Sequence, residues 1–201
     1  EVSIHTMPNE LPDPIPFPDD ELHDAYVPEH ARALMNALVQ SDRVLKAFRA
    51  RFTGQCSPVQ FFWGSFDLAV TRFSGRAAPE HPGGIPFLPD EITREAYSHE
   101  VSSCGFWPGN REAPEPFFYS YAYPTPEGYA EAAVEPTAAY WLTDLGEFVL
   151  PYEAVRVADS PDDAIDAFLQ STYAAAANLA DWDRRNLEWE PGYRPLARRR
   201  F

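Results

Sequence analysis

The sequence predicts an α+β domain, in which two long helices pack on a mainly antiparallel sheet of about four or more strands. Two stretches carry apolar residues at three- and four-residue spacing, as amphipathic helices do. Four other stretches are rich in aromatic and β-branched residues, which is typical of strands. The helices are expected at 29–52 and 160–179, and the strands at 59–73, 98–106, 117–123 and 138–150.

The first long helix is expected to begin beside Pro28, because proline suits the first turn of a helix, and to end at Gly54. One face of this helix carries the large apolar residues that we expect to be buried: Leu34, Leu38, Leu45, Phe48 and Phe52.

The last long helix has the clearest start signal in the chain. Ser160 is a capping residue, Pro161 follows at the first helical position, and Asp163 lies three residues after the cap. Its predicted buried stripe consists of Ile165, Phe168, Leu169, Thr172, Ala176 and Leu179. A short helical turn is expected near 182–187.

The stretch 59–73 is almost continuously apolar, and this pattern predicts a central strand that is covered on both faces. Gly64 and Ser65 interrupt it and predict a bulge. Further along the chain, Asp90 is expected to cap a short helix that runs through Tyr97. A turn is expected at 144–146, within the last strand region.

The domain organisation follows from composition and length. The 201 residues form one domain, with a proline-rich strap at 1–28, a body at 29–189 and a basic tail at 190–201. Val2 and Ile4 alternate with polar residues, so a short strand is expected at 2–5. Because the chain opens directly on this strand without Met, we expect that the strand is cut from something longer. The family resemblance described below implies that the preceding segment is β-rich.

The charge and the cysteines limit the class of protein. Thirty-one acidic residues against 16 basic ones give a net charge of −15, which disfavours binding to nucleic acids and to anionic membranes. No apolar run approaches the ~20 residues of a membrane span. Cys56 and Cys104 show no paired spacing, so two reduced thiols in a cytoplasmic protein are expected in preference to a disulfide.

The candidate site residues are carboxylates in mid-strand beside a high density of aromatic residues. A carboxylate in a strand is costly to bury without a partner, and aromatic walls with a few polar groups are typical of small-molecule sites. The residues selected on these grounds are Trp63, Asp67, His99, Glu100, Trp107 and Tyr121.

Each of these residues also has a structural interpretation. Aromatic strands are usually core, and a single strand histidine such as His99 is usually structural. The strand period of two places His99 and Glu100 on opposite faces. Glu100 is expected to pair with Arg72 or Arg94, whereas Asp67 either accepts backbone hydrogen bonds or lines a pocket.

Other chemistry has little support in the sequence. No phosphate-binding loop, nucleotide-binding glycine motif, nucleophile elbow or zinc-protease motif is present. A metal site could draw on His81, His99 and Cys104, but their spacing does not favour one, and Cys104 lacks an evident base to act as a nucleophile. We therefore predict neither a cofactor nor a metal.

Five sequence strings together resemble a family of bacterial proteins that is known only as a domain of unknown function. They are FFWGSFDLAVTRFSGR at 61–76, EAYSHEVSSCGFWPG at 95–109, FYSYAYPTPEGYAEA at 118–132, LGEFVLPYEAVR at 145–156 and FLQSTYAAAANLADWDR at 168–184. The resemblance implies a cytoplasmic bacterial protein of which this chain is about the C-terminal two thirds. It implies no catalytic residue.

Three functions remain open on the sequence alone. The first is a small-molecule or protein-binding domain with an aromatic cleft, whose partner is a small molecule, the preceding segment of the same protein or a second copy. The second is a hydrolase-like enzyme that uses Asp67, Glu100 or His99. The third is a purely structural domain. Converging carboxylates in a cleft would favour the enzyme.

Overall fold

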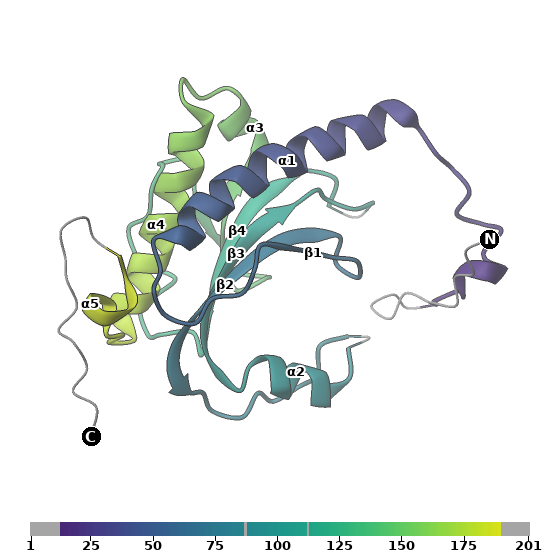
Figure 1. The fold of residues 1–201 in the computed structure, drawn as a ribbon. Helices are drawn as coiled ribbons and strands as arrows, with labels where there is room; N and C mark the ends of the chain where they lie inside the picture. The colour runs from purple at the N-terminus through teal and green to yellow at the C-terminus, as the bar shows by residue number, and fades with distance from the viewer. Residues whose placement is uncertain (1–12, 87, 112, 190–201) are drawn as a thin grey trace.

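Six antiparallel strands form one sheet in the computed structural model, which describes residues 13–86, 88–111 and 113–189. Their spatial order is β1-β2-β3-β4-β6-β5. Figure 1 labels the first four of these strands side by side. The strands are β1 (Gln60–Phe62), β2 (Asp67–Ala77), β3 (His99–Trp107), β4 (Phe117–Tyr123), β5 (Tyr140–Leu142) and β6 (Glu147–Pro151). The α+β class predicted from the sequence is confirmed.

The helices lie mostly on one face of this sheet. The two long ones, α1 (Pro28–Ala50) and α4 (Pro161–Leu179), contact β2, β3 and β4 and each other (Figure 1). The short ones are η1 (Phe17–Asp19), α2 (Asp90–Ala96), α3 (Tyr152–Arg156) and α5 (Arg184–Leu187). The sheet therefore has one face under the long helices and an opposite face that α1 and α4 leave open.

The hydrophobic core fills the space between the sheet and the two long helices. Leu45 and Phe48 of α1, together with Phe168 and Leu169 of α4, are fully buried in it. From the sheet come even-numbered residues of β2, β3, β4 and β6, since successive side chains of a strand alternate between the faces. These include Leu68, Val70, Cys104, Phe106, Phe118, Phe148 and Leu150.

A buried arginine lies within this apolar layer. The Arg72 guanidinium sits 3.4 Å from the centre of the Phe48 ring and 4.3 Å from that of Tyr173, and it donates a hydrogen bond to the Phe48 carbonyl. Burial lowers the pKa of Arg72. Aromatic faces attract a cation most strongly where water is excluded, so these rings offset part of the cost of burying the charge.

The stretch 59–73 differs from its prediction as one central strand. It forms two strands, β1 and the start of β2, which pair as a hairpin with Phe62 opposite Asp67. Gly64 and Ser65 lie in the connecting turn and not in a bulge, and Phe66 leaves this turn with a positive φ of 63°. The apolar run does not form one strand because residues 63–66, near its middle, form an exposed turn.

The helix ends also differ in detail from their predictions. The first helix ends at Ala50, before Gly54, and Leu179 is exposed although it lies at the end of the predicted buried stripe. Ser160 precedes α4 without capping it by a side-chain hydrogen bond, and Pro89, not Asp90, precedes α2. The expected strand at 2–5 and the basic tail lie outside the described residues.

We expect Phe168→Ala to lower the free energy of unfolding by about 3–5 kcal/mol, because the ring is fully buried between α4 and the sheet. Urea denaturation at neutral pH measures this loss. The matched control is Leu179→Ala in the same helix, whose exposed side chain should change stability by less than about 0.5 kcal/mol. Equal losses in the two variants would contradict the register of α4.

Candidate functional site

A cleft of about 640 Å³ lies on the open face of the sheet. Its floor is formed by odd-numbered residues of β2 and β4, which point away from the helices. Its walls come from the β1–β2 turn, the segment that follows β3, and the β5–β6 turn. The lining residues are Ser65, Asp67, Trp107, Asn110, Ala113, Phe117, Tyr119, Tyr121, Leu142, Asp144, Leu145 and Glu147.

Asp67 is the first residue of β2 and is almost completely buried on the cleft floor. The Tyr119 hydroxyl donates a hydrogen bond to its carboxylate. Burial, and then the negative charge of Asp67, raise the pKa of Tyr119 well above its usual value, so this hydroxyl keeps its proton. One of the groups that hold Asp67 in place is therefore a neutral hydrogen-bond donor.

Gly105 makes this hydrogen bond possible. It lies on β3, between Ala69 on β2 and Tyr119 on β4, so the tyrosine must reach across it to Asp67. A Cβ atom at position 105 would lie only 2.6 Å from the Tyr119 hydroxyl oxygen and would also collide with the Leu68 carbonyl. A glycine within a strand often marks such a close approach.

Glu147 supplies a second carboxylate from the opposite wall of the cleft. It begins β6 and alternates with the buried Phe148, so its side chain points to the open face. Burial in the first place, and the charge of Asp67 in the second, raise the pKa of Glu147 to about 7. Near neutral pH this carboxyl is therefore close to half protonated.

A network of hydroxyl groups extends from the cleft across the sheet. The hydroxyls of Tyr97 and Tyr121 lie 2.9 Å apart, and Ser103 and Thr71 form a further pair at 2.9 Å. Burial, followed by the neighbouring Tyr97, raises the pKa of Tyr121 well above its usual value. The tyrosine hydroxyls therefore act as neutral donors and acceptors along the floor.

A smaller hollow of about 340 Å³ adjoins the cleft, and Tyr121 and Glu147 line both. His81 stacks on Tyr97 in this hollow, with ring centres 4.9 Å apart, and contacts Tyr123. At the other end of the cleft, Trp107 and Phe117 lie with ring centres 5.1 Å apart. The Trp107 indole Nε1 donates to the Ser65 carbonyl at 2.9 Å. Aromatic rings thus border both ends.

The structure brings together three of the six residues selected from the sequence, namely Asp67, Trp107 and Tyr121. Trp63 lies in the β1–β2 turn with 79% of its side chain exposed and does not line the cleft. His99 is exposed at the start of β3, where Nδ1 lies 3.1 Å from the Ser98 hydroxyl oxygen.

Glu100 does not share a site with Asp67, because the two lie on opposite faces of the sheet. Glu100 alternates with Val101 and points to the same side as Cys104, towards the helices. There it pairs with Arg76 at 2.7 Å, and not with Arg72 or Arg94 as expected. The second carboxylate of the cleft is Glu147 instead.

Sequence reasoning missed Glu147, Tyr119 and Tyr97. Glu147 directly follows a turn, and its approach to Asp67 depends on β6 lying beside β4. One signal was available for Tyr119. The glycine in mid-strand at position 105 indicates that another group approaches closely, and Tyr119 is that group.

The thiols and the metal-ligating groups form no site among the described residues. Both cysteines are free, and burial raises the pKa of Cys104 to about 12, so this thiol stays protonated beneath the helices. No group of three or more His, Cys, Asp or Glu side chains in the described part of the chain could hold a metal ion. None of the helices described there is long and apolar enough to cross a membrane.

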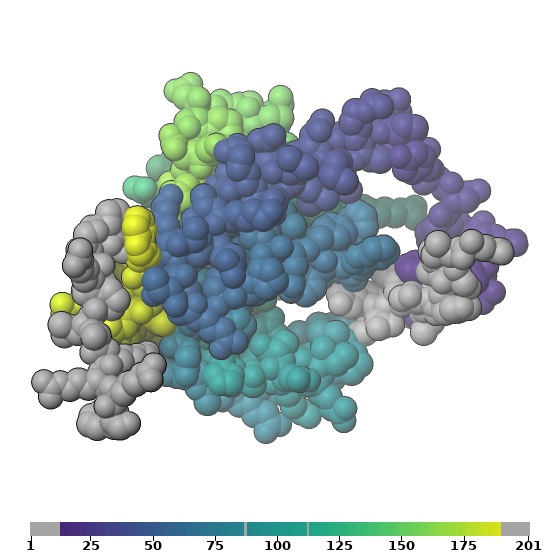
Figure 2. All heavy atoms as spheres, in the orientation of Figure 1, coloured from purple at the N-terminus to yellow at the C-terminus, as the bar shows by residue number. Residues whose placement is uncertain are grey.

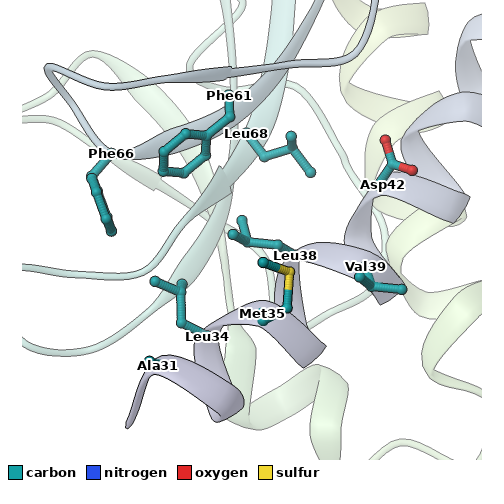
Figure 3. A pocket seen from close by; sticks show the side chains of 9 residues that line it. All are labelled: Ala31, Leu34, Met35, Leu38, Val39, Asp42, Phe61, Phe66 and Leu68. Carbon is teal, nitrogen blue, oxygen red and sulfur yellow. The ribbon is translucent and has the colours of Figure 1, made fainter. Parts of the chain in front are cut away.

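A second hollow, about 500 Å³ in volume, lies between α1 and the β1–β2 hairpin (Figure 3). The N-terminal part of α1, drawn in purple, lies at the upper edge of the molecule in Figure 2. The lining is apolar, with Met35 and Phe66 partly exposed, except for Asp42, which pairs with Lys46. Because it lacks polar groups that could orient a substrate, this groove is a weaker candidate for a specific site than the cleft.

Comparison with family models gives one match, to a family of unknown function (DUF5996), and the match covers residues 1–189. Neither the curated proteins nor the solved structures contain a significant match to this chain. The function must therefore be argued from the geometry of the site.

The raised pKa of Glu147 predicts how stability depends on pH. The folded protein holds this proton up to about pH 7, whereas the unfolded chain releases it near 4.5. The free energy of unfolding therefore loses a contribution as pH rises between these values. Glu147→Gln removes the titrating group and with it this pH-dependent loss of stability. At pH 8 the free energy of unfolding of the variant should therefore exceed that of the wild type by about 1–3 kcal/mol, whereas the difference at pH 4.5 should be much smaller.

Urea denaturation of both proteins at pH 4.5 and pH 8 measures this difference. The matched control is Glu100→Gln, which breaks the ion pair with Arg76 on the other face and should not gain stability as pH rises. Parallel pH dependence of Glu147→Gln and the wild type would contradict the burial of the Glu147 carboxyl.

Proposed function

We propose that this chain, which belongs to the DUF5996 family of unknown function, is a small-molecule-binding domain whose ligand occupies the cleft on the open face of the sheet. One observation carries the proposal. Two carboxylates from strands far apart in the sequence, Asp67 and Glu147, line one aromatic cleft on the face of the sheet that α1 and α4 leave open. The family resemblance also supports a bacterial, cytoplasmic setting.

The shape of the cleft favours binding over a purely structural role. Ligand sites usually occupy about 300–1,000 Å³ and combine apolar walls with a few polar groups that orient the ligand. The cleft has this size, with Trp107 and Phe117 as walls and Asp67, Tyr121 and Glu147 as polar groups. A structural core at this position would be filled by its own side chains.

The free-energy cost of burying Glu147 also supports a role in ligand binding. A half-buried carboxyl with a raised pKa lowers the stability of the folded protein, and a glutamine or an apolar residue would avoid that cost. Groups that cost stability are found where function requires them. We therefore assign Glu147 and Asp67 to ligand binding.

One observation supports a hydrolase-like enzyme as the second candidate. Glu147 has a pKa of about 7, near the optimum for a general acid or base, and it faces another carboxylate. In such an enzyme Asp67 and Glu147 would act together, whereas Glu100 and His99, the other residues considered from the sequence, lie outside the cleft. A metabolite extract incubated with the wild type and with Glu147→Gln separates the two candidates. An enzyme would deplete a compound that the variant leaves intact, whereas a binding domain would deplete none.

The proposed function predicts which tryptophan reports binding. The indole groups give separate NMR signals, and a library of small aromatic compounds should shift the Trp107 indole signal because that ring forms a wall of the cleft. The Trp63 signal, from the exposed turn, should not move. If no compound in the library shifts the Trp107 signal, the cleft is not a small-molecule site.

The affinity of any compound that shifts the Trp107 signal should depend on the Trp107 ring. Trp107→Ala removes aromatic contact area and should weaken binding about tenfold or more in calorimetry. Trp63→Ala is the matched control, since it removes an exposed indole outside the cleft and should leave the affinity unchanged.

A further inference from the structure

One apolar face of α1 continues beyond the part of the helix that packs on the core. Leu45 and Phe48, in the C-terminal half of the helix, are buried against the sheet. Leu34 and Leu38 continue this face at three- and four-residue spacing. They line the groove between α1 and the β1–β2 hairpin, together with Phe66 of the hairpin (Figure 3). Because a helix normally packs its apolar face against another element, this part of α1 is ready to receive a partner.

Several large apolar side chains are exposed together in this groove. Met35 is 59% exposed, Val39 54% and Phe66 47%, and all three line the groove. A single exposed apolar residue is ordinary on a protein surface, whereas a contiguous group of them marks an interaction site. The groove is therefore a binding surface for the apolar face of a partner.

The lining of the groove favours a helical partner. Asp42 carries the one polar side chain among the lining residues, and it pairs with Lys46 at 2.6 Å. A partner in the groove must therefore satisfy its own backbone hydrogen bonds, which an α-helix does and an extended segment does not. With α1 on one side and the hairpin on the other, the groove matches the recognition mode in which an amphipathic helix lies in an apolar groove.

A negatively charged segment leads directly to the groove. Residues 13–29 carry six carboxyl groups and no lysine or arginine. They come immediately before Ala31, the first residue of α1 that lines the groove. Residues 21–27 are all exposed, and Figure 1 shows this segment in purple at the N-terminal end of α1. The carboxylates are therefore open to a partner at one end of the groove.

The positive residues of α1 offset little of this negative charge. Arg32 is the single lysine or arginine in the N-terminal half of the helix. Further along, Arg43 pairs with Asp162 and Lys46 with Asp42, so these two positive charges are balanced by carboxylates. The groove thus combines an apolar lining with a negatively charged approach. A helix with one apolar face and one positively charged face complements both.

We propose that the groove between α1 and the β1–β2 hairpin binds a basic amphipathic α-helix of another protein. The apolar face of that helix packs on Leu34, Met35 and Phe66, and its lysine or arginine residues face the carboxylates of 13–29. The groove lies on the helix-covered side of the sheet, so this inference is independent of the small-molecule cleft. A second copy of this chain is a poorer partner, because two chains of net charge −15 repel each other.

Synthetic peptides test the inference on the complete chain. A peptide of about 14 residues is long enough to run beside α1 from Ala31 to Asp42, and it carries leucine on one helical face and lysine on the other. One control peptide has glutamate in place of lysine, and a second keeps the lysines but has two central prolines that prevent a helix. In calorimetry the basic helical peptide should bind about tenfold or more tightly than either control, and added salt should weaken its binding.

The groove is located as the binding surface by NMR and by one pair of variants. The basic peptide should shift the methyl signal of Met35 and leave the indole signal of Trp107, in the cleft, unchanged. Met35→Gln places a polar group in the groove and should lower the affinity for the peptide about tenfold. The matched control is Leu179→Gln, an exposed apolar residue of α4, which should keep the affinity within about twofold.

A second pair of variants separates attraction by residues 13–29 from attraction by the whole acidic protein. Glu21→Gln combined with Asp24→Asn should lower the affinity about fivefold or more and reduce its dependence on salt. Glu127→Gln combined with Glu131→Gln removes the same charge from exposed positions elsewhere and should keep the affinity within about twofold.

The opposite results overturn the inference. If the acidic peptide binds as tightly as the basic one, or if Met35→Gln leaves the affinity unchanged, a basic helix does not occupy the groove. If the proline-containing peptide binds equally well, the partner is an extended segment. If sedimentation shows that the chain forms a dimer and that Met35→Gln abolishes it, the groove is instead occupied by a second copy.

Discussion

The long helices cover only one face of the sheet, and the properties of the cleft follow from this constraint. Because strand side chains alternate, each strand contributes one set of residues to the core and another to the open face. The core set is apolar and completes the packing of α1 and α4. The open set is free to be polar, and it brings Asp67 of β2 and Glu147 of β6 to one cleft although β3 and β4 lie between their strands.

A single side chain connects β2 and β4, which are separated by β3. Tyr119 reaches over Gly105 on the strand between them and bonds to Asp67. This arrangement gives the buried carboxylate a neutral hydrogen-bond donor, as a buried polar group requires. The fold thereby fixes the position of this carboxylate in the cleft floor.

The local pattern of residue types was sufficient to predict most helices and strands. It was insufficient to predict which strands lie side by side. The period of two along β3 correctly separates His99 from Glu100, and the aromatic density around Tyr121 correctly marks the open face. The candidate site placed Asp67 and Glu100 together, but the two lie on opposite faces of the sheet. Their relative orientation depends on the phase between two strands, and the hairpin turn at Gly64 obscured that phase. Glu147 could not be found because its approach to Asp67 requires the strand order, which one sequence does not specify.

The strand β2 carries both a buried cation and a buried anion, and their spacing keeps them apart. Asp67 and Arg72 are separated by five residues, an odd number, so they point to opposite faces of the sheet and cannot neutralise one another. On the helix side, the chain provides its own solution: aromatic rings of α1 and α4 and the Phe48 carbonyl surround the guanidinium. On the open side, Asp67 lines a cleft that is bordered by the rings of Trp107 and Phe117. The two faces of β2 therefore carry out different tasks, since one face encloses a buried cation in the core and the other contributes a carboxylate to the cleft.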